Sequence, residues 1–181
     1  MNSTIIKQRA REQFSNGASR AEAFQACRDQ GVKDESLASI IASLKDDTLC
    51  QLYSGRNNFL ISITFVQGLL VTFISYYAGL KNGSESALWA AGVAAFLFAL
   101  FIAGFYRCSL RTYVIYICIS FYSLFIELGN GDLVSIAVCG LLLGFVWHVK
   151  TKLYPFFGLF RAKQINGQYA FLIEESTRNL D

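Results

Sequence analysis

The chain has 181 residues, of which 54% are hydrophobic and only 16% are charged, and its formal net charge is +3. This balance excludes an ordinary soluble domain and a disordered chain. The small net charge and the lack of a nucleic-acid-binding motif predict no nucleic-acid partner. Only six of the 29 charged residues fall within 57–149. We therefore expect an all-α membrane protein in three parts, 1–56, 57–149 and 150–181.

The first 56 residues predict a small cytoplasmic module of three helices. An opening helix covers about 3–14. The Ser19-x-x-Glu22 spacing is a capping box that begins a second helix, and Gly31 is expected to close it. The eight positive and seven negative charges of this part nearly cancel, which favours a docking surface over a nucleic-acid-binding one.

A third helix of the module is expected to begin with Asp34 as its cap. Apolar residues then recur at the i, i+3, i+4, i+7 spacing of a buried face. They are Leu37, Ile40, Ile41 and Leu44.

Four apolar runs in 57–149 are each close to the roughly 20 residues that cross a bilayer. They cover about 58–80, 87–105, 112–128 and 133–149. Because the linkers are short, consecutive spans are expected to be antiparallel neighbours in a four-transmembrane-helix bundle.

Basic residues near the ends of the spans predict the orientation. One side carries only Lys81. The other side carries Arg56, Arg107, Arg111, Lys150, Lys152, Arg161 and Lys163. Since positive residues mark the cytoplasmic side, both termini are expected in the cytoplasm, in a plan typical of small bacterial inner-membrane proteins.

Small residues predict packing faces, because spans associate by close approach of their backbones. Alanine occupies every fourth position of the second span, and the fourth span carries a Gly-x-x-x-Gly pair. These residues are Ala87, Ala91, Ala95, Ala99, Ala103, Gly140 and Gly144. Such faces serve either packing within the chain or a subunit interface of a homo-oligomer.

The third span carries a polar stripe, defined by residues that recur every three or four positions. They are Ser109, Thr112, Tyr116, Ser120, Ser123 and Glu127. The stripe predicts a face turned away from lipid. Glu127, with Asp132 nearby, is either an interfacial residue at a helix end or part of an acidic pore mouth in an oligomer.

Several residues at the cytoplasmic ends are expected to contact lipids at the membrane interface. They are Arg107, Arg111, Trp147, His148, Lys150 and Lys152. Arg107 and Arg111 either anchor the span or bind lipid phosphates or the N-terminal module. His148 is the only histidine, so no metal site is predicted, and its place beside Trp147 favours either an interfacial anchor or a pH-responsive group.

The last part, 150–181, places aromatic residues between basic ones, which is typical of a segment lying in the headgroup region. Within it, Asn166-Gly167 between alternating flanks predicts a β-hairpin.

No catalytic motif is found in the sequence, and no catalytic residue, cofactor or metal is predicted. We expect a non-enzymatic protein that acts through helix packing with itself or a membrane-protein partner. An assembly subunit, a membrane sensor and an immunity factor against a membrane toxin all fit this description. The alternative is a homo-oligomeric ion channel lined by the polar stripe.

Overall fold

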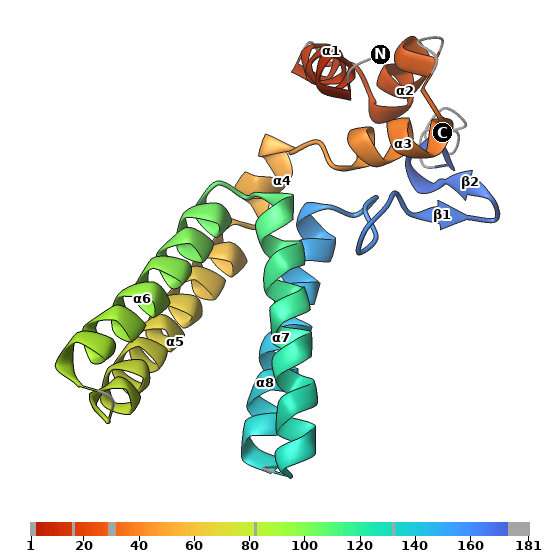
Figure 1. Cartoon of the computed structure of the whole chain (residues 1–181). Coiled ribbons are helices and arrows are strands. Elements are labelled where there is room, and N and C mark those ends of the chain that lie inside the picture. Colours follow the sequence, from red (N-terminus) through yellow and green to blue (C-terminus); the bar gives the residue numbers. More distant parts are fainter. Residues whose placement is uncertain (1–2, 16, 29–31, 82, 132, 174–181) are drawn as a thin grey trace. The chain divides into compact units, whose positions relative to one another are not determined.

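The computed structural model describes residues 3–15, 17–28, 32–81, 83–131 and 133–173, and it is mostly helical (Figure 1). The chain divides into two compact units. Unit 1 combines 1–46 with 154–181, and unit 2 is 47–153. The predicted helix stop at Gly31 and the carboxylate of Asp132 lie outside the described residues.

Unit 1 contains the predicted three-helix module, formed by α1 (Ser3–Ser15), α2 (Arg20–Arg28) and α3 (Asp34–Ala42). The capping box of α2 is confirmed, because the Glu22 amide donates to Ser19 Oγ at 3.1 Å and the Ser19 amide donates to the Glu22 carboxylate at 2.7 Å.

The predicted cap of the third helix is wrong. Lys33 occupies the cap position of α3 and makes no side-chain capping bond. Asp34 is instead the first helical residue, and its carboxylate lies 3.2 Å from the Arg28 guanidinium. The Asp34 carboxylate that was expected to cap α3 therefore forms an ion pair with Arg28 of α2 instead. Its negative charge still stabilises the N-terminus of α3 through the helix dipole.

The predicted β-hairpin is confirmed by β1 (Gln164–Ile165) and β2 (Gln168–Tyr169), which pair antiparallel. Asn166 and Gly167, the two residues of the turn, have φ of 51° and 80°. Asparagine and glycine adopt this left-handed conformation at low cost, which is why the pair selects a tight hairpin turn.

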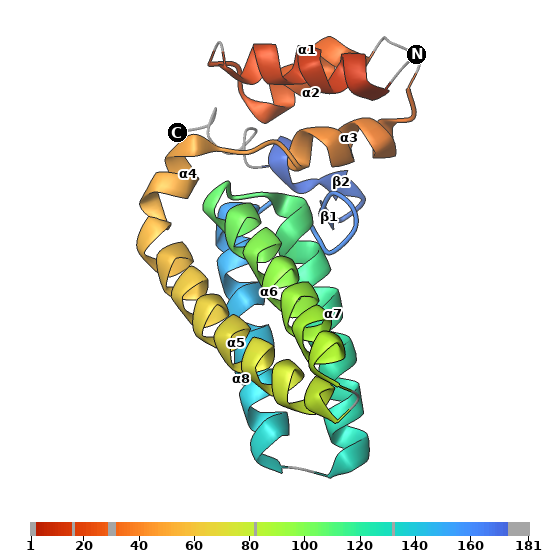
Figure 2. The ribbon, with the colours of Figure 1, turned by 60° about the vertical axis from the view of Figure 1, so that its left-hand side comes forward.

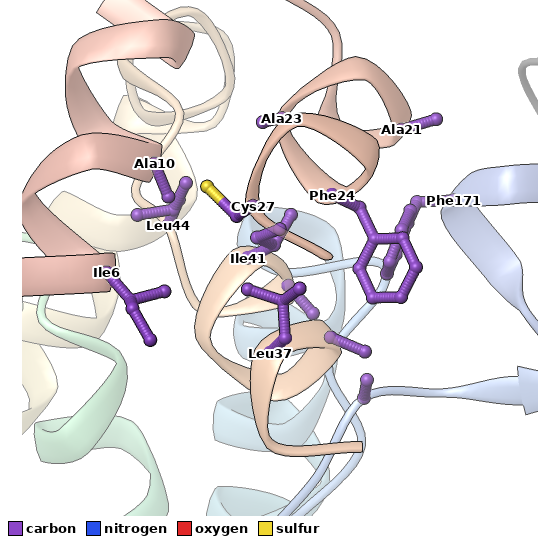
Figure 3. Packing of buried hydrophobic residues seen from close by; sticks show 13 residues of the cluster. Ile6, Ala10, Ala21, Ala23, Phe24, Cys27, Leu37, Ile41, Leu44 and Phe171 are labelled. Atoms are coloured by element: carbon purple, nitrogen blue, oxygen red, sulfur yellow. The ribbon is translucent and has the colours of Figure 1, made fainter. Parts of the chain in front are cut away.

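The core of unit 1 joins both ends of the chain (Figure 3). Leu37 and Ile41 of α3 are fully buried, and Phe24 of α2 meets Phe171 with ring centroids 5.7 Å apart. Phe156 and Phe157 also pack against this core. These two rings therefore differ from the expected headgroup-lying segment, because the module offers them a protein surface.

Unit 2 contains α4 (Asp47–Leu52), α5 (Ser54–Leu80), α6 (Ser84–Tyr106), α7 (Leu110–Asn130) and α8 (Leu133–Leu153). The last four are long and apolar enough to cross a membrane, as the four apolar runs predicted.

These four long helices pack as two helical hairpins, α5 with α6 and α7 with α8 (Figure 1, Figure 2). At the tight end of the first hairpin, Gly79 lies against the backbone of Ala87. Contacts between the hairpins are fewer, and they run from the end where α5 begins and α8 ends to the level of Gln67 and Tyr116. The arrangement is thus a pair of hairpins rather than an evenly packed bundle.

Candidate functional site

A groove lies between the two hairpins of unit 2, and we call it the inter-hairpin groove. It is a small hollow of about 80 Å³ to which all four spans contribute. Its walls are Gln67 of α5, Phe98 and Phe101 of α6, Tyr116, Ile119, Ser120 and Ser123 of α7, and Cys139 and Leu142 of α8.

Helical spacing brings the polar wall together. Tyr116, Ser120 and Ser123 are four and three residues apart on α7, so they share one face of that helix. Phe101 of α6 packs against this face, since its ring meets the Tyr116 ring edge-on with centroids 5.2 Å apart. The groove therefore has one polar wall and one aromatic wall.

One hydrogen bond crosses the groove from hairpin to hairpin. The Tyr116 hydroxyl donates to Gln67 Oε1 at 2.6 Å. Within the described part of the chain, the hydroxyls of Ser120 and Ser123 have no hydrogen-bond partner. The site thus offers two hydroxyl groups, and the donor group of the Gln67 amide, in a segment that is otherwise apolar.

A buried polar cluster fixes the hairpins next to the groove. Asn57 of α5 is only 4% exposed, and its Nδ2 donates to the Phe105 carbonyl at 2.9 Å and contacts Cys108 Sγ at 3.9 Å. The Tyr113 hydroxyl of α7 donates to Asn57 Oδ1. Asn57 therefore ties the start of the first span to the turn between the second and third.

Only the middle residues of the polar stripe predicted on α7 line the groove. Tyr116, Ser120 and Ser123 line the hollow, whereas Ser109 and Thr112 lie at the start of the helix. Thr112 packs against Gly104, where an added Cβ would come within 2.1 Å of the Thr112 hydroxyl. Glu127 is half-buried near the far end of α7 and does not line the hollow.

The alanine row predicted on the second span does not form one buried face in this chain. Ala87 is buried and Ala91 is half-buried, and the rest of the row is exposed, namely Ala95, Ala99 and Ala103. Each step of four residues advances the direction by about 40° around a helix, so five such residues cannot face one neighbour.

The face of α6 that does pack alternates steps of four and three. It consists of Ala87, Ala91, Ala94, Phe98, Phe101 and Phe105. This is the spacing that keeps two long helices in contact along a seam. Gly140 and Gly144 of α8 have no atom near the place where a Cβ would stand, so they make no close approach within the described residues.

The residues predicted to lie at the membrane interface divide into two groups. Arg107, Arg111 and Lys152 are exposed, and Trp147 is 43% exposed. Lys150 differs, because it is fully buried and its Nζ lies 5.5 Å from the centre of the Trp147 ring. Burial of a lysine side chain against an aromatic ring is a specific protein contact rather than simple anchoring.

Sequence reasoning missed the partners of two residues at this end. His148 Nε2 lies 2.9 Å from an Arg56 guanidinium nitrogen, and the two are 92 positions apart in the chain. The partners of Asn57 could not be predicted either, because in the sequence Asn57 is an ordinary polar residue at the start of an apolar run. Long-range pairs of this kind leave no periodic signal in a single sequence.

A larger and more open hollow, of about 670 Å³, lies in unit 1 between α2 and the β-hairpin. Its charged side chains already interact with one another or with the backbone. Glu22 accepts the bond of the capping box, and Arg28 is paired with Asp34. Because these charged groups already have partners, this hollow is a weaker candidate for a binding site than the inter-hairpin groove.

Among the described residues, no three histidine, cysteine or acidic side chains lie close enough together to hold a metal ion. Comparisons of the chain with known protein families, with curated proteins and with solved structures find no significant match.

Proposed function

We propose that the chain is a multi-pass inner-membrane protein that acts without catalysis, by packing its spans against another copy or against a membrane-protein partner. The observation that carries this proposal is the inter-hairpin groove, in which Ser120 and Ser123 lack hydrogen-bond partners within the described residues. An assembly subunit, a sensor and an immunity factor are all proteins of this kind.

Lipid chains cannot satisfy the polar wall of the groove. In hydrocarbon, a hydroxyl or amide gains a hydrogen bond only from protein or from trapped water. A transmembrane helix that presents a small or polar residue to Gln67 and Ser120 would supply those bonds and cover Phe98 as well. Interhelical bonds of this type contribute about 0.6–2 kcal/mol each.

The shared core of unit 1 supports an even number of crossings. Ala162 and Phe171 belong to the same core as α2 and α3, so both flanks of the spans lie on one side of any membrane that α5–α8 cross. The basic residues at this end, such as Arg107 and Lys152, favour the cytoplasmic side for it. A reporter active in the periplasm when fused after position 181 would contradict that orientation.

Photocrosslinking in cells tests whether the groove receives a partner. A photoreactive phenylalanine analogue replaces Ile119, which lines the groove and is 50% exposed. The matched control replaces Phe121 on the same helix, which is 51% exposed and does not line the groove. We expect a protein adduct of one defined mass from position 119 and none from 121. Equal yields from both positions would refute the proposal.

The exposed alanines give a second test for association between copies. Ala95 is not covered within the chain, so Ala95→Leu should leave the stability of a monomer unchanged. If another copy covers this face, the added atoms overpack it and shift the mass in detergent toward the monomer. Phe96→Ala, at a neighbouring 64% exposed position, serves as the control.

An ion channel is the alternative, favoured by the part of the polar stripe that lines the groove. Tyr116, Ser120 and Ser123 would line a conducting path completed by other copies. Glu127 would then set the charge preference at the mouth, and Glu127→Gln should lower cation over anion selectivity. Planar bilayers with purified protein decide this, since an absence of current at every voltage would exclude the channel.

A further inference from the structure

Arg56 and His148 form a contact between the hairpins at the end where the spans begin and finish. A guanidinium nitrogen of Arg56, on α5, lies 2.9 Å from His148 Nε2, on α8. Both residues are exposed, and the guanidinium also lies 5.5 Å from the centre of the Tyr53 ring. Two basic side chains from separate hairpins thus share one solvent-facing position.

The chemistry of this contact leaves only donors facing outward. Arginine cannot accept a hydrogen bond, so Nε2 of His148 is the acceptor and the ring hydrogen is on Nδ1. The remaining N–H groups of Arg56 and the Nδ1–H of His148 need acceptors. Within the described residues, neither side chain is paired with a carboxylate.

The surface beside the pair is apolar on the side of the spans. About one turn from the pair, after Arg56 on α5 and before His148 on α8, the rings of Phe59 and Phe145 meet edge-on with centroids 5.5 Å apart. Phe59 is 58% exposed and lies on the part of α5 that continues into the apolar run. A ligand at this place therefore meets donors at one end and aromatic rings at the other.

The charges around the pair favour an anion. Lys152 is exposed one turn after His148 on α8, whereas Lys150 is buried, and α4, which contacts α5 and α8, begins with the acidic residue Asp47. Positive side chains are thus in excess. A phosphate group is an acceptor-only anion that matches the planar donor array of arginine.

We propose that Arg56 and His148 form a binding site for the phosphate of an anionic phospholipid, whose acyl chains lie along Phe59 and Phe145. This inference rests on the proposed function in one respect, that α5 and α8 cross a bilayer. Bound there, one lipid headgroup would bridge the two hairpins beside the inter-hairpin groove.

Native mass spectrometry of the full chain in detergent tests the site. Phosphatidylglycerol and phosphatidylcholine with identical acyl chains are added separately, and the fraction of protein carrying one lipid is measured. We expect retention of phosphatidylglycerol at least about tenfold tighter than that of phosphatidylcholine. Both lipids carry a phosphate, but the choline cation of phosphatidylcholine offsets its charge and is repelled by Arg56. Equal retention of the two lipids would overturn the proposal.

Variants separate a specific site from a merely basic surface. Arg56→Gln and His148→Ala should each weaken phosphatidylglycerol binding by about tenfold. Arg107→Gln removes the same charge from an exposed arginine of the same end and should change binding less than twofold. An equal loss from Arg107→Gln would show that general attraction accounts for the binding. Thermal melting of each variant confirms that it is folded.

A competition arm identifies the source of the phosphate. Inorganic phosphate at millimolar concentration should leave the bound phosphatidylglycerol in place, because it lacks the acyl chains that contact Phe59. Displacement by phosphate would assign the site to a free anion and overturn the lipid inference. None of these lipid-binding outcomes depends on the photocrosslinking at Ile119. A failure of the lipid site and a failure of the proposed function can therefore be distinguished.

Discussion

The hydroxyl of Tyr113 donates a hydrogen bond to the side-chain oxygen of Asn57, and both groups are buried where α5, α6 and α7 meet. Asn57 in turn donates to the Phe105 carbonyl at the end of α6. One amide therefore links α5, α6 and α7.

Tyr113→Phe should destabilise unit 2 by about 1–3 kcal/mol, because it leaves the Asn57 oxygen buried without this donor. The measurement is the thermal midpoint of the protein in detergent. Tyr106→Phe is the control, since Tyr106 is 79% exposed. Equal midpoints for the two variants would mean that the Asn57 contact contributes nothing.

Gly79→Ala should open the first hairpin. An added Cβ would lie 2.6 Å from Ala87 Cα and 2.9 Å from its nitrogen, and backbone atoms cannot move aside as a side chain can. Overpacking of this kind costs about 1–3 kcal/mol, which lowers the thermal midpoint.

Gly92→Ala provides the opposite expectation on the same hairpin. Gly92 lies inside α6 with no atom near the place where a Cβ would stand. Alanine stabilises a helix interior by about 0.5–1 kcal/mol relative to glycine, so this variant should melt higher. A lower midpoint for Gly92→Ala than for Gly79→Ala would contradict the packing of α5 on α6.

Phe171→Ala should destabilise unit 1 by about 3–5 kcal/mol. Phe171 is 3% exposed and its ring packs against those of Phe24 and Tyr169, so truncation leaves a cavity in the shared core. Limited proteolysis should then cut within α1–α3 at lower protease concentration. Phe160→Ala, at a 70% exposed position, should leave the proteolysis pattern unchanged.

Alkaline pH should weaken unit 1 through Cys27. Burial raises the pKa of the Cys27 thiol, with Arg9 opposing the shift, so the folded chain holds the neutral thiol more tightly than the unfolded chain does. This contribution is fully present below the unfolded pKa and is lost as pH rises through the folded one.

Melting between about pH 8 and pH 10 should therefore show a steeper loss of stability for the natural chain than for Cys27→Ala. The comparison removes the titration of other groups, which both proteins share. Parallel pH profiles would indicate that the thiol ionises equally in both states.

The local features of the fold were predictable from the sequence. The capping box at Ser19 and the Asn166-Gly167 turn follow from short-range spacing, and both are confirmed. The same holds for four helices that are long and apolar enough to cross a membrane. The predicted Asp34 cap was wrong because Arg28, on the neighbouring helix, pairs with the Asp34 carboxylate.

The candidate site was predictable only in part. Helical spacing identified Ser120 and Ser123 as residues turned away from lipid, and both line the inter-hairpin groove. The other walls come from separate spans, and no spacing rule aligns Gln67 with Tyr116 or Arg56 with His148. The alanine row recurs every fourth position, whereas the α6 residues that pack within the chain alternate between steps of four and three, so the row did not identify them.

The core that joins the two ends of the chain has a consequence for synthesis. The Ala162 amide donates to Ser39 Oγ across 123 positions, and Phe171 completes the apolar cluster later still. During translation, Leu37 and Ile41 can pack with α1 and α2 early, but the face of the core that Ala162 and Phe171 cover stays uncovered until the segment after α8 has been made. A ribosome that stops early thus releases a chain with this face exposed, which is the kind of surface that chaperones and proteases recognise.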